Sequence, residues 1–542
     1  MNPQEILKFC LERGLLLDRD VLNLFNETND EESVKLIIQR MKESTNQKII
    51  TKSLFNQNKE KVFQILSTLP KENQQQLEGL KIKLGLSIEI LREISKSENQ
   101  EKGEKQIENQ DPIEGVKVLS SILKKTKKIE VADFTKHFRN RVSEMKMILQ
   151  ENSSLKNLVS INKLSNTRQS ASIIGIVSGK TITKNKNIIF EVEDLTGTIK
   201  VLVSPNNAAI FEKADEVCLD SVLGFSGFGS REIIFCSQIV FPESSLPERK
   251  HSPYDENVLF LGDLHYGSKL FLKEGFDKFI HYINGKVPNT PETEKIKYLF
   301  LVGDLIAGVG NYPSQEKDLE IKDIEEQFIG VSQLLSKIRK DIKIIISPGN
   351  HDAVRLMEPQ PLLNERFAWS LYNLKNVIMT GNPASVNIGA KKDFSGFDVL
   401  TYHGFSFPYY ANTVPKLIKA GKAMNTPDKI MTYLLQNRHL APSHTSVQHY
   451  PSEEDALMIK KIPDIFLSGH THKSAVSYYN NILMVSSSSW EAMTARQEKM
   501  GNEPDFCKVP MFNLKTRTIK MLDFEDEENK KEKIDKIVER GK

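Results

Sequence analysis

The sequence predicts a multidomain protein in which a layered α/β domain follows an all-β barrel and a small helical N-terminal domain. Three patterns indicate this order. Residues 1–75 have helix-like apolar spacing, residues 171–245 alternate as strands do, and residues 250–525 contain continuous apolar runs separated by segments of helical spacing. At about 150 residues per domain, a chain of 542 residues has room for three or four domains.

Composition excludes several classes of protein. Hydrophobic residues make up 39% and charged residues 27%, as in ordinary globular proteins, so a fibre and global disorder are excluded. The net charge of +3 is too small to indicate nucleic-acid binding by itself. The four cysteines lie far apart, which argues against a disulfide framework or a zinc ribbon. The start, MNPQEILKFC, has an acidic residue where a signal peptide needs a basic one, and no stretch approaches the ~18 apolar residues of a membrane span, so we expect a cytoplasmic protein.

The N-terminal part is expected to serve interactions. Residues 1–75 predict a helical interaction module, and residues 76–115 predict a helix and a flexible polar linker, because residues 96–112 contain a single aliphatic side chain. Residues 116–170 predict a basic helical segment, with twelve Lys or Arg against four acidic residues. This excess favours either contact with a phosphate backbone or a solvated helix face, and both interpretations stay open.

Residues 171–245 predict five short strands with a helix between the third and the fourth. This pattern resembles the oligonucleotide/oligosaccharide-binding (OB) barrel. Such a barrel could bind single strands through aromatics such as Phe225 and Phe228, or it could be a platform for a partner protein, which we favour. Prolines at 242, 247 and 253 then mark the boundary to the α/β domain.

The α/β domain spans residues 250–525, and a charged tail, residues 526–542, follows it. Within the domain, metal-capable side chains follow five apolar runs. These side chains are Asp263, His265, Asp304, Asn350, His351, Asp352, His403, His470 and His472. Sheets of α/β domains gather ligands at the carboxyl ends of their strands. Carboxylates with neutral imidazoles suit two divalent metal ions, for which we expect manganese, with iron, zinc or magnesium as alternatives. Two such ions about 3.5–4 Å apart can hydrolyse a phosphoester.

The blocks GDLHYG, GDLIAG, GNHD, YHG and GHTH occur in the order typical of the calcineurin-like metallophosphoesterases, which the chain therefore resembles. By that resemblance Asp263, His265 and His472 hold one metal, Asn350, His403 and His470 hold the other, and Asp304 bridges them. His351 resembles the family's catalytic histidine, which binds no metal and gives a proton or a hydrogen bond to the leaving oxygen. The protein phosphatases of the superfamily carry an Asp-Arg pair and GNHE instead, so the motifs favour the nuclease branches.

The wider arrangement of helical module, linker, basic segment, barrel and phosphoesterase resembles the small subunits of archaeal family D DNA polymerases. That resemblance implies a metal-dependent 3′→5′ exonuclease that proofreads for a replicative polymerase by a two-metal mechanism. It also implies a heterodimer with a large catalytic polymerase subunit, and DNA with a single-stranded or mismatched 3′ end as substrate. Two alternatives remain: a scaffold subunit with weak or no catalysis, and a phosphomonoesterase or cyclic phosphodiesterase.

A second group of histidines, His439, His444 and His449, falls between the fourth and fifth motifs. Their spacing invites a metal interpretation, but we expect a surface loop over the active site, as a lid or a DNA-contacting region. Trp490 is expected to pack at the end of the last strand of the sheet.

Overall fold

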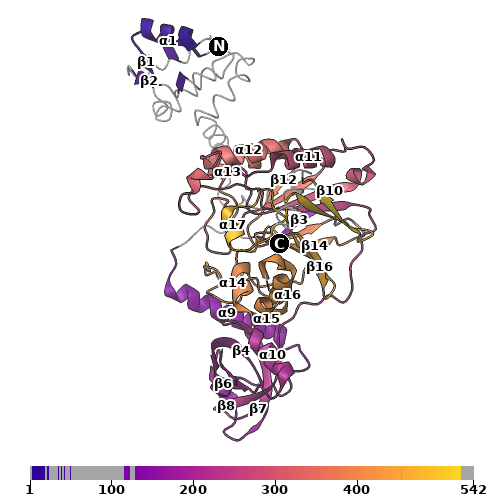
Figure 1. Cartoon of the computed structure of the whole chain (residues 1–542). Coiled ribbons are helices and arrows are strands. Elements are labelled where there is room, and N and C mark those ends of the chain that lie inside the picture. Colours follow the sequence, from indigo (N-terminus) through magenta and orange to yellow (C-terminus); the bar gives the residue numbers. More distant parts are fainter. Residues whose placement is uncertain are drawn as a thin grey trace, which may run out of the picture. The chain divides into compact units, whose positions relative to one another are not determined.

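The computed structural model describes residues 3–18, 21–22, 34–35, 38–39, 42, 49–50, 115–121 and 128–525, apart from 422 and 453. The chain divides into two compact units, Met1–Gln110 and Asp111–Lys542 (Figure 1). The first unit contains helix α1 (Pro3–Glu12) and a short parallel pair, β1 (Leu16–Leu17) with β2 (Ile49–Ile50), which the helical interpretation did not include. Most of the predicted module 1–75, nearly all of the linker 76–115 and the tail 526–542 lie outside the described residues.

The predicted basic helical segment is partly wrong. Residues Val116–Ser120 form strand β3, which pairs antiparallel with β13 (Ala384–Ile388) at the edge of a sheet in the α/β domain. Apolar Val116 and Val118 lie on either side of Lys117, which is the two-residue period of a strand. The prediction missed this pattern because it considered only the number of basic residues in the segment. Helix α9 (Val131–Leu149) lies within this segment and buries one face that includes His137 and Arg141.

The second unit contains a closed five-stranded barrel in the order β4-β5-β6-β8-β7. The elements are β4 (Gln169–Ile182), β5 (Ile188–Asp194), β6 (Gly197–Val203), α10 (Ala208–Glu216), β7 (Val222–Gly229) and β8 (Ile233–Val240), so the helix follows the third strand as predicted. Alternate residues of β5 and β6 point inward and are buried. Phe225 is fully buried in this core and cannot stack on a base, whereas Phe228 on the same strand is 53% exposed.

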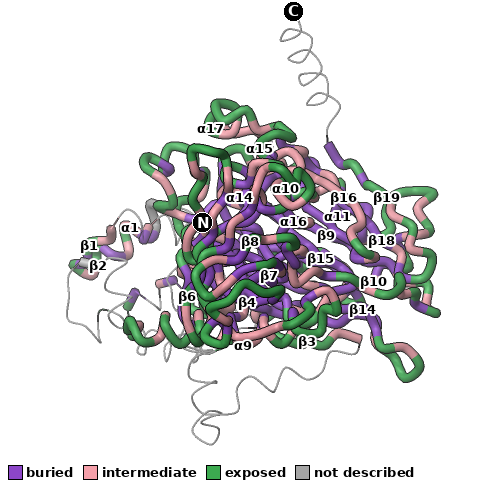
Figure 2. Tube along the Cα trace, turned by 90° about the horizontal axis from the view of Figure 1, so that it is seen from below, coloured by how far each residue is buried: buried purple, intermediate pink, exposed green. Residues whose placement is uncertain are grey.

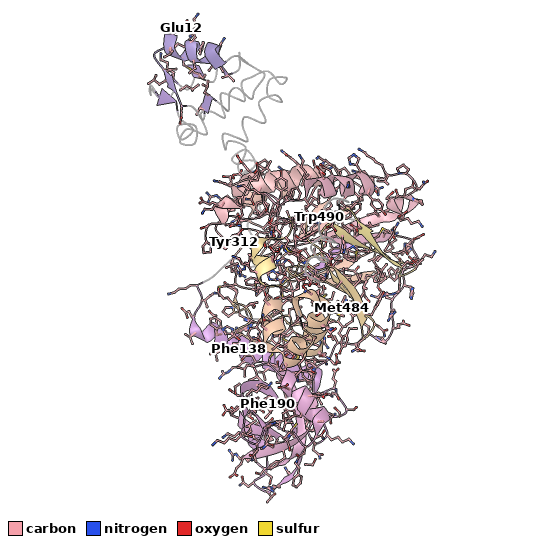
Figure 3. All side chains as sticks on the ribbon, in the orientation of Figure 1. Glu12, Phe138, Phe190, Tyr312, Met484 and Trp490 are labelled. Atoms are coloured by element: carbon pink, nitrogen blue, oxygen red, sulfur yellow. The ribbon has the colours of Figure 1, made fainter. Side chains whose placement is uncertain are left out.

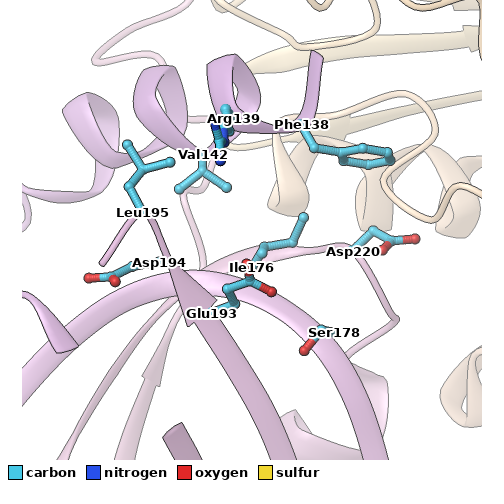
Figure 4. Close-up of a pocket in the computed structure, with 9 residues that line it drawn as sticks. All are labelled: Phe138, Arg139, Val142, Ile176, Ser178, Glu193, Asp194, Leu195 and Asp220. Atoms are coloured by element: carbon cyan, nitrogen blue, oxygen red, sulfur yellow. The ribbon is translucent and has the colours of Figure 1, made fainter. Parts of the chain in front are cut away.

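Helix α9 packs against the barrel and leaves an open hollow of about 250 Å³ (Figure 4). Phe138, Val142, Ile176 and Leu195 form its apolar part, and Glu193, Asp194 and Asp220 are its acidic lining residues. It shares no residue with the metal-capable side chains at the strand ends.

Two six-stranded sheets form the α/β domain. The first has the order β12-β11-β10-β9-β18-β19, and the second has the order β16-β17-β15-β14-β13-β3. Their strands are β9 (Asn257–Leu261), β10 (Ile296–Val302), β11 (Lys343–Ser347), β12 (Val377–Met379), β14 (Phe397–Tyr402), β15 (Ile465–Ser468), β16 (Ala475–Tyr479), β17 (Ile482–Ser486), β18 (Lys508–Asn513) and β19 (Ile519–Asp523), with β3 and β13 as given above. β9 to β12 run parallel, as do β14, β15 and β17. The carboxyl ends of each parallel set therefore lie at one edge of its sheet.

Each sheet buries one face against the other sheet and the second face against helices. One cluster joins the sheets, with Phe260 and Phe300 of the first and Val399 and Leu467 of the second. Helices α11 (Lys273–Ile283), α12 (Ile324–Ser336) and α13 (Glu365–Tyr372) pack on the first sheet; α14 (Phe407–Thr413), α15 (Pro415–Lys419) and α16 (Pro427–Asn437) pack on the second. The continuous apolar runs are therefore explained by two covered faces, one of which is the neighbouring sheet. Figure 2 shows the buried strands inside the exposed loops.

Trp490, labelled in Figure 3, is fully buried, as predicted. It contacts Phe276 and Phe279 in the core of the first sheet. The segment that follows β17 therefore crosses to the first sheet, where it passes the metal-capable side chains.

Candidate metal centre

All eight predicted site residues meet where the carboxyl ends of the two sheets come together. Those following β9, β10 and β11 come from the first sheet, and those following β14 and β15 come from the second. Three overlapping groups have ligand atoms within 4.8 Å of one another: Asp263, His265 and His472; His265, Asp304 and His351; Asp304, His403 and His470. Both sheets contribute side chains, so the packing of one sheet on the other assembles the site.

Asp304 lies between the two groups expected to hold metals. Its Oδ2 is 3.3 Å from His403 Nε2 and 3.9 Å from His265 Nε2, which belong to different groups. The amide of Asn350 places Oδ1 3.1 Å from His403 Nε2. This arrangement fits a carboxylate shared by two cations, while the roles of the individual ligands stay predictions.

Glycines of the motifs let the loops approach one another closely. A Cβ at Gly303 would lie 2.4 Å from His403 Nδ1, and one at Gly349 would lie 2.2 Å from Asp304 Oδ1. Five of the site residues have a left-handed backbone: Asp263, His265, Asp304, His470 and His472. Such conformations cost about 1–3 kcal/mol each and persist where the surrounding structure holds them, as at functional sites.

Burial and charge keep most imidazoles of the site neutral. Burial lowers the pKa of His265 and of His472 to about 3, with the neighbouring histidines acting in the same direction. Burial would raise the pKa of Asp304, but His403, His351 and His265 hold it well below its ordinary value. Neutral imidazole and ionised carboxylate are the forms that bind metals.

Two contacts between buried side chains have an arrangement that a cation could occupy. The first joins His265 and His472, and the second joins His403 and Asp304. The Nε2 atoms of His265 and His472 lie 3.0 Å apart, and burial raises the pKa of the enclosed Asp263 well above its ordinary value. Burial would lower the pKa of His403, but Asp304 raises it to about 10. A divalent cation can replace that proton as the partner of Asp304, so the donor set fits the expected metals.

His351 is held through both its ring and its backbone. Its Nδ1 lies 2.7 Å from the carbonyl oxygen of Ala307, and its backbone N–H donates to Asp304 Oδ1 at 2.8 Å. Nδ1 also lies 3.0 Å from the amide nitrogen of Asn311, so both described hydrogen-bond partners of the ring are at Nδ1, and Nε2 has no hydrogen bond to any described residue. Asp352 accepts hydrogen bonds from the backbone N–H groups of Ile306 and Gly349, and so ties the loops after β10 and β11 together.

Several supporting residues carry no motif and were missed by sequence reasoning. The carbonyl of Val302 accepts from His403 Nδ1, and Asn382 accepts from the His403 backbone N–H, which orients this imidazole. Ser487 donates to Asp263, and Gln497 lies 2.8 Å from His472. Of these supporting residues, only Ser487 was marked in the sequence, by the SSSS run after β17.

The prediction that the second histidine group lies in a surface loop over the active site is wrong, because the group packs against α9, where the half-buried His444 contacts Phe134 and Phe138. His439 and His449 are 1% exposed, and they meet His137 and Arg141 of α9 around the buried carboxylate of Asp455. These five residues are called the α9 cluster below. The physical reason is that α9 covers this stretch, because its buried face carries polar groups that need partners.

In the described part of the chain, no helix has the length and apolar character needed to cross a bilayer.

The comparisons with known proteins agree with the motifs. A model of the family formed by the B subunits of DNA polymerases alpha and epsilon matches residues 258–477. A DNA polymerase II small subunit from Pyrococcus furiosus is 36% identical over 406 residues, which cover 73% of this chain but 64% of that protein. A solved structure of an archaeal phosphodiesterase aligns with 12% identity and a TM-score of 0.24, over 49% of this chain and 98% of that chain.

The DNA polymerase II small subunit of Methanothermobacter thermautotrophicus is 35% identical over 399 residues, which cover 73% of this chain and 80% of that protein. The resemblance expected from the motifs is thereby confirmed, and the chain belongs to the family of archaeal DNA polymerase II small subunits.

Proposed function

We propose that the chain is the proofreading subunit of a replicative DNA polymerase, a metal-dependent 3′→5′ exonuclease. The observation that carries the proposal is the set of three overlapping groups of ligand atoms at the strand ends, two of which share Asp304 and one of which includes His351. A metal site kept only for structure has little use for a histidine whose Nε2 makes no hydrogen bond to another described residue.

The ligand residues divide the work between two cations. Asp263, His265 and His472 would hold one, Asn350, His403 and His470 the other, and Asp304 would contact both. When bound, the ions, for which we propose manganese, would polarise the scissile phosphodiester and activate a water for in-line attack. The protein holds the imidazoles of His265, His470 and His472 neutral and the Asp304 carboxylate ionised, whereas His403 would have to lose its proton when a cation binds.

His351 has the position of a general acid. Ala307 and Asn311 both contact Nδ1, so Nε2 is the nitrogen left open for the substrate, and a proton on it can be donated to the departing 3′ oxygen. The proposal therefore assigns His351 to the leaving group rather than to a metal.

The rest of the chain is proposed to position the site on DNA. We assign the barrel to the OB class and make it a platform for a large catalytic polymerase subunit, because Phe225 is buried and only Phe228 of the two predicted aromatics is exposed for stacking. The substrate is then DNA with a frayed or mismatched 3′ end. We place this activity in the cytoplasm.

The test uses the purified chain, with and without Mn²⁺, on 5′-labelled single-stranded DNA and on a 3′-mismatched primer-template. Asp304→Asn and His351→Ala should each lower nucleotide release at least about a hundredfold. The matched controls are Asp277→Asn and His281→Ala on α11, whose side chains lie outside the site and should leave the rate unchanged.

The alternatives give different results. Absence of metal-dependent release, both alone and with the large subunit, would indicate a scaffold. Faster hydrolysis of a chromogenic phosphomonoester than of DNA would indicate a phosphomonoesterase. A loss in Asp304→Asn with full activity in His351→Ala would remove the general-acid role while leaving the metal centre in place.

A further inference from the structure

Gln497 is the one side chain of helix α17 (Ala495–Lys499) for which a contact with a predicted metal ligand is seen in the described structure. Its Nε2 lies 2.8 Å from Nδ1 of His472. The other ring nitrogen, Nε2, lies 3.0 Å from His265 Nε2 and 3.6 Å from Asp263 Oδ1, so it faces the metal position. His472 is 6% exposed, and its ring environment is therefore set by the protein.

The orientation of the Gln497 amide is determined by Thr494. The Oε1 atom of Gln497 accepts from the backbone N–H of Thr494 at 2.9 Å and lies 3.1 Å from its hydroxyl, in the capping box that begins α17. A backbone N–H can only donate, so Oε1 must face Thr494 and the NH₂ group must face His472.

This orientation selects a proton position on His472. An amide NH₂ only donates, so Nδ1 of His472 must accept, and the proton of the neutral ring then lies on Nε2. Nε2 is the nitrogen that faces Asp263 and His265. A ring that binds a cation through Nε2 must instead carry its proton on Nδ1, which would bring two donors face to face at Gln497.

We propose that Gln497 is a positioning residue that disfavours the metal-binding tautomer of His472, and that metal binding requires its amide to turn over and leave the capping box. The proposal rests on the proposed function, since it concerns the cation held by Asp263, His265 and His472. Helix α17 is thereby linked to the metal: occupancy of this position weakens the start of the helix, and a stable start weakens occupancy.

The proposal predicts an unusual direction of effect, since removing a contact to a ligand normally weakens metal binding about 10–100-fold. In Gln497→Glu a carboxylate accepts from both Nδ1–H and Thr494, so Mn²⁺ should bind about tenfold more tightly. Gln497→Met adds no charge and removes the donor, so its affinity should lie between those of Gln497→Glu and the wild type. Gln333→Glu on the exposed face of α12 is the matched control for charge.

The full-length chain is titrated with Mn²⁺ and free ion is measured by electron paramagnetic resonance. In parallel, ¹⁵N-histidine spectra of the metal-free chain, assigned with His472→Asn, report the tautomer of His472. The expected result is an Nε2–H ring in the wild type, an Nδ1–H ring in Gln497→Glu, and the stated order of affinities. An Nδ1–H ring in the wild type, or tighter binding in Gln497→Glu alone, would overturn the proposal. If no chain binds Mn²⁺, the proposed function fails, and the tautomer of metal-free His472 still decides the role of Gln497.

Discussion

The metal centre and the α9 cluster are built from the same kinds of residue but differ in their charge balance. In both, several histidines surround a buried aspartate, Asp304 in one and Asp455 in the other, and each carboxylate has its pKa held well below the ordinary value. At Asp455 the guanidinium of Arg141 contacts Oδ2 at 2.6 Å. For Asp304, a permanent cation of this kind is absent from the described contacts.

The difference indicates which cluster is available to metals. The Arg141 guanidinium already compensates Asp455, and His439 donates to the same oxygen at 3.0 Å, so the α9 cluster is a closed network. In the metal centre the imidazole Nε2 atoms of His265 and His472 face one another instead. A permanent cation beside a buried carboxylate is therefore a better mark of a structural site than the count of histidines.

Removing the cation from the α9 cluster should have the largest effect on stability. Arg141→Met leaves the Asp455 carboxylate buried without its charge partner, which typically costs about 3–5 kcal/mol. We expect that loss in the free energy of unfolding, measured in urea at pH 7.

Arg139→Met, an exposed position on the same helix, should change the free energy by less than about 0.5 kcal/mol. Adding Asp455→Asn to Arg141→Met should restore part of the loss, because it removes the uncompensated charge. If the double variant is no more stable than Arg141→Met, the loss is due to packing and the comparison of charges fails.

Metal addition should stabilise the chain through one cluster alone. At a free Mn²⁺ concentration about one hundred times its Kd, binding to the folded state adds about 2.7 kcal/mol. Asp304→Asn should abolish this increment, whereas Asp277→Asn and Arg141→Met should keep it. Unfolding in urea, with Mn²⁺ or with EDTA, measures the difference. An increment lost in Arg141→Met would show that the α9 cluster also takes part in metal binding.

The candidate ligands were readily predicted because each lies within four residues of the end of an apolar strand. Asp304, for example, follows LFLVG, and its neighbours along the sheet edge follow from parallel pairing. The α9 cluster could not be predicted in this way. Arg141 and Asp455 are 314 residues apart and no strand pairing joins their segments, so their contact depends on how α9 packs. The same holds for Gln497, which reaches His472 from a helix of five residues.

Acidification should destabilise the α9 cluster. His403, which pairs with Asp304, should instead lose its contribution to stability at alkaline pH. Burial and then Arg141 lower the pKa of His439 to about 4. The unfolded chain, with a pKa of about 6.5, takes up this proton first, so stability falls as the pH drops from about 6.5 towards 4, by about 2 kcal/mol at pH 5.

His403 has its pKa raised to about 10 in the metal-free chain, so its contribution is lost as the pH rises from about 6.5 towards 10. Urea unfolding in EDTA between pH 5 and pH 10 separates the two. His439→Gln should flatten the acid limb by about one proton and leave the alkaline limb unchanged, and the reverse outcome would contradict the assignment of neutral histidines to the α9 cluster.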